Sequence, residues 1–189
     1  MTLFDTHAHL DDDRFAADLP AVLERAKAAE VDHVVTIATT ASSSAASIAL
    51  AARHPLVYAS VGIQPNHVAE AAADAWDRVF ELVNSKKVVA VGETGLDRHW
   101  NYTPFPQQED LFSRHLQLAR EKDLPVVIHC REAEADVVRM LRDEFNRHGP
   151  VRGVMHSFTG DWATAEACMT SAGIMWSYVS MLEWWVMVL

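Results

Sequence analysis

Hydrophobic positions along the chain follow two different periods. Short, nearly continuous apolar runs predict buried strands, and between them apolar residues recur every three or four positions, as expected for helices that pack along one face. The predicted strands cover residues 3–10, 31–40, 56–63, 87–96, 124–130, 151–158 and 172–180. The clearest predicted helices cover residues 20–30, 42–54, 75–85, 108–123 and 134–148.

This alternation of strand and helix predicts a parallel sheet with helices packed outside it. Six strand–helix units and a seventh strand indicate an α/β fold of the TIM type, a (β/α)8 barrel that is incomplete, because a full barrel typically needs about 250 residues. A doubly wound open sheet is the alternative, but the sequence lacks the GxGxxG fingerprint expected near the first strand of that fold. We expect one barrel domain over residues 1–180 and an atypical hydrophobic tail over residues 181–189.

Composition narrows the classes of partner. The 189 residues are 50% hydrophobic and 22% charged, which is typical of a folded domain. The net charge of -10 disfavours broad adhesion to duplex DNA or to an anionic membrane, so a nucleic-acid substrate would have to be captured locally. The two cysteines, Cys130 and Cys168, make no disulfide framework, and a strand that starts near residue 2 leaves no room for a signal peptide. We therefore expect a cytoplasmic protein without a membrane anchor.

The stretch FDTHAHL places Asp5, His7 and His9 at alternate positions. In a strand these three side chains share one face, because successive side chains point to opposite sides. Each buried polar group costs about 1–3 kcal/mol unless it is bonded. A bound metal ion is the compensation that this pattern predicts.

Three more polar residues, Glu93, His129 and His156, follow apolar runs that predict strands. The carboxyl ends of barrel strands converge on one rim, so these side chains and the His7–His9 pair are expected to form one metal constellation. Two divalent ions bridged by a carboxylate would fit, since imidazole suits Zn or Mn and carboxylate also accepts Mg. Counting back by twos from Glu93 places Val91 on the same strand face. A histidine taken alone is more often a hydrogen-bonded residue, which is our interpretation of His33, His54, His67, His115 and His148.

Five stretches resemble, in order and spacing, the TatD family of metal-dependent deoxyribonucleases within the amidohydrolase superfamily. They read FDTHAHLDD, VGIQPNHV, AVGETGLDRHWNYTPFPQQEDLF, LPVVIHCREAEADVVRML and VMHSFTGDW, and the resemblance runs from residue 3 to about residue 180. It implies a TIM-type barrel with divalent metals that hydrolyses phosphodiester bonds. The implied activity is that of a 3′ to 5′ exonuclease acting on single-stranded ends of DNA and sometimes RNA.

The resemblance also implies roles for individual residues. His7 and His9 would bind one metal, Glu93 would bridge two metals as the catalytic carboxylate, and His129 and His156 would bind the second metal. The two divalent cations would be Mg, Mn or Zn. Asp5 would orient a histidine ligand, as metal-bound imidazoles usually require.

Candidate substrate contacts follow the ligand strands. The guanidinium of Arg131 could bind a phosphate oxygen, or it could instead form an ion pair with Glu132 or Glu134. Three residues after the bridging carboxylate could stack on bases or pack on the barrel rim: His99, Trp100 and Tyr102.

The sequence departs from the family pattern in two places. Gln64 stands where family members often have histidine, and the family continues to an eighth strand whose E-T-D motif supplies a further metal ligand and general base. Without that aspartate we expect low activity, and open strand edges would favour self-association. The alternatives are a truncated, inactive metal-binding remnant, another amidohydrolase-type hydrolase, or a histidinol-phosphatase-like phosphoesterase. The oligomeric state is not predicted.

Overall fold

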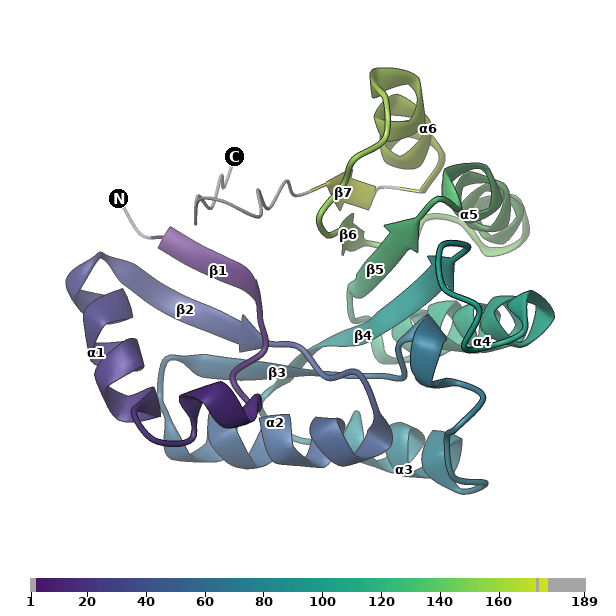
Figure 1. The fold of residues 1–189 in the computed structure, drawn as a ribbon. Coiled ribbons are helices and arrows are strands. Elements are labelled where there is room, and N and C mark those ends of the chain that lie inside the picture. The colour runs from purple at the N-terminus through teal and green to yellow at the C-terminus, as the bar shows by residue number, and fades with distance from the viewer. Residues whose placement is uncertain (1–2, 173, 177–189) are drawn as a thin grey trace.

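The computed structural model describes residues 3–172 and 174–176 (Figure 1). These ranges contain all of the predicted helices and the first six predicted strands. The predicted tail over residues 181–189 lies outside the described residues, as does the part of the predicted seventh strand beyond residue 176.

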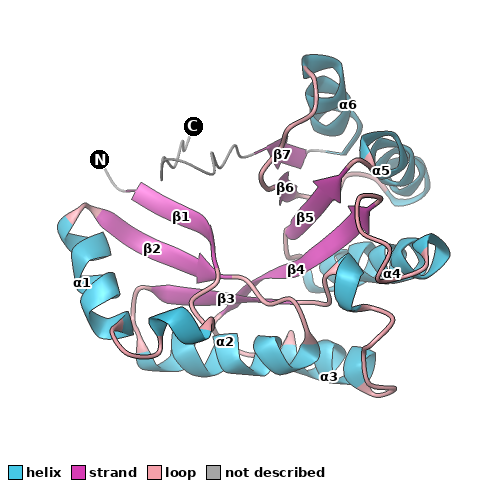
Figure 2. Cartoon of the chain, in the orientation of Figure 1, coloured by secondary structure: helices cyan, strands magenta, loops and turns pink. Residues whose placement is uncertain are grey.

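Seven parallel strands form one sheet in which spatial order follows chain order. The strands are β1 (Leu3–Ala8), β2 (Val31–Thr36), β3 (Val57–Val61), β4 (Val88–Asp97), β5 (Val126–Arg131), β6 (Gly153–Met155) and β7 (Ile174–Trp176). The sheet curls, and the helices lie around its outer side (Figure 2). This arrangement confirms the predicted incomplete (β/α)8 barrel.

A helix follows each of the first six strands. The helices are α1 (Leu19–Ala28), α2 (Ala41–Arg53), α3 (Ala75–Leu82), α4 (Phe105–Lys122), α5 (Glu134–His148) and α6 (Trp162–Ala172), with short 3-10 turns η1 (Asp13–Phe15) and η2 (Pro65–His67). Local hydrogen bonds and residue types determine where some helices begin. Thr40 and Ser43 form a reciprocal capping box at the N-terminus of α2. A Pro at the second position of α4 has no backbone N–H to lose there.

Alternate residues of the strands pack on opposite sides of the sheet. Val126 and Ile128 of β5 belong to the main core, together with Phe112 of α4. Val127, between them, packs instead with Val35 of β2 in a separate cluster. The outer side of the sheet is therefore sealed by helices, while the inner side is left to carry polar groups as well as apolar ones.

No helix among the described residues has the length and apolar character needed to cross a membrane.

His115 of α4 connects that helix to the backbone that follows β3 through a hydrogen bond. Its ring is fully buried, Nε2 accepts the backbone N–H of Ile63 at 3.1 Å, and Nδ1 lies 2.8 Å from the carbonyl oxygen of Leu111. Burial lowers the pKa of His115 to about 4. The interpretation of His115 as a hydrogen-bonded core residue is confirmed.

We predict that His115 makes stability depend on pH. Between pH 6.5 and about 4 the unfolded chain protonates this ring and the native chain does not, so stability from this residue is lost as pH falls through that window. The contribution changes by about 1.4 kcal/mol per pH unit. Urea unfolding between pH 5 and 8 should show a shallower pH slope for His115→Leu than for the wild-type chain.

The same substitution leaves the N–H of Ile63 without its acceptor, so at pH 7.5 it should lower the free energy of unfolding by about 1–3 kcal/mol. His148→Gln, at an exposed position at the end of α5, is the matched control and should keep the wild-type slope. Equal slopes for His115→Leu and wild type would contradict the prediction.

Candidate metal centre

Glu93 is a buried residue on the inner side of the sheet, and its carboxylate lies at the centre of a cluster of histidines. It lies within β4, with 3% of its surface exposed. The pairing of β4 with β5 is irregular between Val91 and Thr94, and such an irregularity re-aims side chains. Val91 packs in the outer core, while the Glu93 carboxylate meets imidazoles, so the prediction that these two residues share a strand face is wrong.

Glycines allow the strands to approach closely at this point. A Cβ on Gly62 would lie 2.7 Å from the backbone of Gly92, and a Cβ on Gly92 would lie 2.5 Å from the carbonyl oxygen of Val127. Gly92 also has a φ of +139°, which L side chains rarely adopt. The backbone at Gly92, directly before Glu93, is thus packed so closely against its neighbours that a Cβ at that position has no room.

One carboxylate oxygen of Glu93 faces two imidazoles from neighbouring strands. Oε1 lies 3.1 Å from Nδ1 of His129, which is in β5, and 3.1 Å from Nε2 of His156, which directly follows β6. The ligand atoms of these three residues all lie within 4.8 Å of one another. They form a set that could hold a metal ion.

The other oxygen of Glu93 faces His7 of β1 and His9, which directly follows that strand. Oε2 lies 3.6 Å from Nε2 of His7 and 3.9 Å from Nε2 of His9, and the two Nε2 atoms are 3.3 Å apart. These three residues form a second candidate ligand set. The rings of His7 and His156 stack at 4.0 Å between centroids, so the two sets are in contact.

Burial and mutual contact control the charges of this cluster. Burial, followed by the proximity of His156, lowers the pKa of His7 to about 3, so its ring is neutral and has a lone pair to donate at neutral pH. Burial alone would raise the pKa of Glu93, but His156 and His129 outweigh it and hold that pKa well below its usual range. Glu93 is therefore an anion surrounded by imidazoles.

Asp97, four residues after Glu93 in β4, is a member of the site that the sequence analysis missed. Its side chain is buried, and Oδ2 lies 2.9 Å from Nε2 of His129 and accepts a hydrogen bond from the side-chain amide of Asn66 at 2.9 Å. Burial alone would lower the pKa of His129, but the carboxylates of Glu93 and Asp97 raise it. The signal in the sequence was a second acidic residue at an even spacing on the same strand.

Asp5, which was predicted to orient a histidine ligand, contacts the backbone of one. Its carboxylate accepts the backbone N–H of His7 at 3.0 Å, and no contact with an imidazole ring is among those described. His9 is oriented differently, since its Nδ1 lies 3.0 Å from the carbonyl oxygen of Ile37. Asp97, by contrast, contacts the ring of His129 directly, at the nitrogen opposite the one that faces Glu93.

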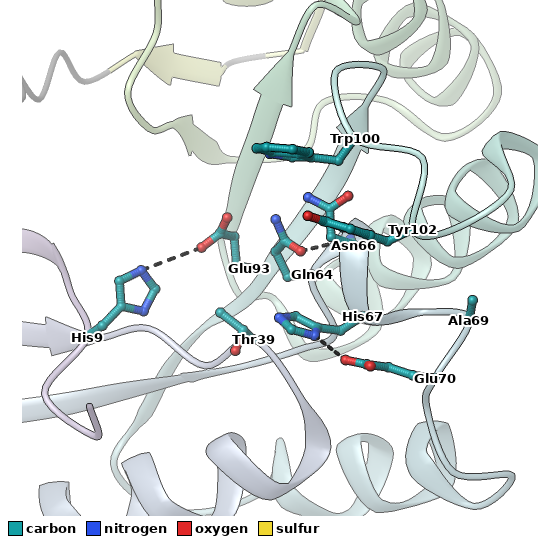
Figure 3. Close-up of a pocket in the computed structure, with 10 residues that line it drawn as sticks. All are labelled: His9, Thr39, Gln64, Asn66, His67, Ala69, Glu70, Glu93, Trp100 and Tyr102. Atoms are coloured by element: carbon teal, nitrogen blue, oxygen red, sulfur yellow. Dashed lines mark hydrogen bonds and ion pairs between the residues drawn. The ribbon is translucent and has the colours of Figure 1, made fainter. Parts of the chain in front are cut away.

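A cavity of about 840 Å³ opens beside the cluster (Figure 3). Its lining includes His9 and Glu93 from the cluster, Gln64 from the loop after β3, and Trp100 and Tyr102 from the loop after β4. In the close-up, the Trp100 and Tyr102 side chains extend into this space from one side, and His9 lies on the opposite side. The structure therefore brings two of the predicted base-stacking residues to the candidate centre.

The other predicted substrate contacts lie beside this cavity rather than in its lining. The guanidinium carbon of Arg131 is 5.6 Å from the centre of the Trp100 ring. The alternative ion pairs of Arg131 with Glu132 or Glu134 are not seen among the described residues. Glu132 instead pairs with Nδ1 of His99 at 2.8 Å.

Comparison with known proteins identifies relatives over most of the chain. The chain is 37% identical over 167 residues to a Bacillus subtilis protein named uncharacterized metal-dependent hydrolase YabD, covering 88% of this chain and 65% of YabD. It is 36% identical over 168 residues to a Pantoea protein named 3'-5' ssDNA/RNA exonuclease TatD, covering 88% of this chain and 64% of that protein. The chain thus spans less than two thirds of the length of these relatives.

Solved structures give the same result. The crystal structure of YJJV, a TatD homologue from Escherichia coli, superimposes with a TM-score of 0.83 at 32% identity and covers 92% of this chain and 66% of that one. A TatD family hydrolase from Entamoeba histolytica shares the fold with a TM-score of 0.83 at 22% identity, over 94% of this chain and 65% of that one. The family described as TatD related DNase matches residues 4–184. Since that match covers nearly the whole chain, the chain belongs to the TatD-related DNase family.

Proposed function

We propose that this chain holds two divalent cations around Glu93 and hydrolyses phosphodiester bonds in single-stranded nucleic acid from the 3′ end. One observation carries the proposal: the two oxygens of a single buried carboxylate face two separate pairs of imidazoles. This is the arrangement expected of a carboxylate that bridges two ions. In the proposal His7 and His9 hold one ion and His129 and His156 hold the other.

The donor set fits divalent cations. Imidazole nitrogens suit Zn and Mn, and a carboxylate also accepts Mg or Mn. The ligand atoms within each set lie within 4.8 Å of one another. His7 is neutral at ordinary pH because of its lowered pKa, so an ion would not have to displace a proton from that ring.

The protein residues have distinct tasks in this proposal. When bound, the ions supply positive charge that polarises the scissile phosphate and acidifies a water molecule. Glu93 neutralises part of that charge and keeps the two sites adjacent, while Asp97 holds the ring of His129 from its far side. Four positive charges at one point would also attract a phosphate to a chain whose net charge is -10.

The choice of substrate rests on the relatives. Several curated relatives are named 3'-5' ssDNA/RNA exonuclease TatD, and YabD is named only a metal-dependent hydrolase. These names support a single-stranded nucleic acid as the substrate of this chain. A substrate panel of single-stranded DNA, RNA, a phosphotriester and a dihydropyrimidine tests the proposal, and preferred cleavage of either of the last two would overturn it.

We predict that His7→Ala and His129→Ala each lower the amount of metal bound per chain. Each substitution removes a ligand nitrogen near Glu93, and neither residue belongs to the main core. Metal content after gentle purification, measured by mass spectrometry, is the test. His148→Ala, at an exposed position, is the control and should keep the wild-type content. If both ligand variants bind as much metal per chain as the wild type, the assignment of these two residues as ligands is wrong.

We predict that Glu93→Gln abolishes nuclease activity and leaves the far-ultraviolet circular dichroism unchanged. A neutral amide cannot neutralise two cations as the carboxylate does, whereas the size of the side chain is conserved. Glu121→Gln, at an exposed position on α4, should retain full activity. Wild-type turnover by Glu93→Gln would mean that the carboxylate has only a structural role.

Asp97→Asn tests the positioning role of the second carboxylate. The amide keeps the shape of Asp97 but removes the charge that faces Nε2 of His129, so we expect metal affinity to fall about 10- to 100-fold. Titration with Mn²⁺ followed by calorimetry measures this affinity. Asp110→Asn, which changes an exposed pair with Arg114 on α4, is the matched control. Identical affinities for the two variants would remove Asp97 from the site.

A further inference from the structure

The loop that joins β4 to α4 holds two exposed aromatic rings beside the candidate centre. We call residues 98–104 the aromatic loop. Trp100 is 42% exposed and Tyr102 is 61% exposed, and their rings stack at 5.4 Å between centroids with planes 13° apart. Large aromatic side chains usually bury their surface, so two rings that expose theirs on a cavity wall suggest a ligand with a flat apolar face.

The aromatic loop is fastened at both of its ends. Gln108 of α4 is buried, its Oε1 accepts the backbone N–H of Asp97 at 2.9 Å, and its side-chain amide donates to the carbonyl oxygen of Thr103 at 3.0 Å. Oδ1 of Asp97 accepts the backbone N–H of Trp100 at 2.9 Å. Binding to a loop already held in place loses little conformational entropy.

Asp97 connects the Trp100 ring to the candidate metal centre. Its Oδ1 holds the backbone of Trp100, and its Oδ2 contacts the ring of His129. One buried carboxylate therefore holds the backbone of Trp100 at a fixed place relative to the histidine ring. Glu93 and Trp100 line the same cavity, so a ligand could reach the cluster and the aromatic rings together (Figure 3).

The net charge of the chain makes stacking a better source of affinity at the aromatic loop than broad contact with a nucleic-acid backbone. Glu70 lines the cavity and is paired with His67, and Arg131 is the cation beside the Trp100 ring. With a net charge of -10, the chain has little capacity to bind a nucleic-acid backbone along its surface. Stacking is short-ranged and tolerates any base sequence, so it can supply affinity that electrostatics does not.

We infer that Trp100, with Tyr102 behind it, binds an unpaired nucleobase of the strand whose phosphate lies at the candidate metal centre. The inference rests on the proposed function, and it specifies why the substrate would be single-stranded: a paired base cannot offer its face to the indole. Arg131 lies beside the same ring and adds cation–π contact to the stack. The site is a base-stacking subsite that reads no sequence.

The experiment uses the full chain with Mg²⁺ and a single-stranded oligonucleotide with phosphorothioate linkages, which slow hydrolysis. A 2-aminopurine is placed at the 3′-terminal, second or third position, and its fluorescence is quenched when it stacks. We expect strong quenching at one of these positions with the wild-type chain. Trp100→Ala should remove the quenching and raise Kd about 5- to 100-fold, and Trp100→Phe should restore part of both.

Phe80→Ala is the matched control. Phe80 is also an exposed aromatic residue, 45% exposed on α3, with the ammonium of Lys122 5.2 Å from its ring centre, and it does not line the cavity. It should keep the wild-type Kd and quenching. Circular dichroism and melting temperature of all variants establish that they are folded.

A second experiment removes the nucleobase of the substrate instead of the indole ring of Trp100. An abasic site at the quenched position should weaken binding to the wild-type chain and leave binding to Trp100→Ala unchanged, since the partner is already missing. A fully base-paired end should bind more weakly than a single-stranded end. Equal Kd values for wild type and Trp100→Ala, an abasic site without effect on the wild type, or absence of quenching at every position would each overturn the inference.

The outcome for this subsite is separable from the outcome for the proposed function. Cleavage by the wild-type chain with no effect of Trp100→Ala would leave the hydrolase proposal intact and remove the stacking site. Stacking that depends on Trp100, in a chain that cleaves none of the substrates, would retain the stacking site and overturn the hydrolase proposal.

Discussion

The buried carboxylate of Glu93 is the constraint on which the inner side of this structure depends. Removing an ion from water costs several kcal/mol unless partners compensate for it. Here the compensation comes from four imidazoles, with His129 and His156 at one oxygen and His7 and His9 at the other. Burial acts to raise the pKa of the carboxylate, but His156, His129 and His7 outweigh it, lower that pKa and keep Glu93 charged. The result is a negative centre lined with nitrogen donors, which is the chemistry that a divalent cation needs.

The curl of the parallel sheet brings these residues together. His7 comes from β1 and His156 follows β6, with β2 to β5 between those strands in the sheet, yet their rings stack at 4.0 Å. Parallel strands carry their carboxyl ends to one rim, and the curl of the sheet turns that rim into an open arc (Figure 1). The outer helices make this possible, because the apolar core lies between them and the sheet and the inner side can carry polar groups.

Asp97 joins two parts of the site that differ in chemistry. One of its oxygens contacts the ring of His129 and the other holds the backbone of Trp100, so a buried carboxylate ties the ligand cluster to the aromatic loop. Asn66 and Gln108 support this arrangement, through the Asp97 side chain and backbone respectively. These hydrogen bonds hold both oxygens and the backbone N–H of Asp97, and a site held in place in this way loses less entropy when it binds a ligand.

The sequence alone determined the order of strands and helices, the incomplete barrel and the residue types of the candidate centre, because hydrophobic period is a local property and alternate histidines share a strand face. Tertiary structure decided the rest. The irregular pairing of β4 with β5 turned Glu93 away from the face of Val91, which no count along a single strand reveals. Likewise Asp97 reaches the ring of His129 because β4 and β5 are neighbours in the sheet, and the distance between those two strands decides that contact. Spacing in the chain carries no information about that distance.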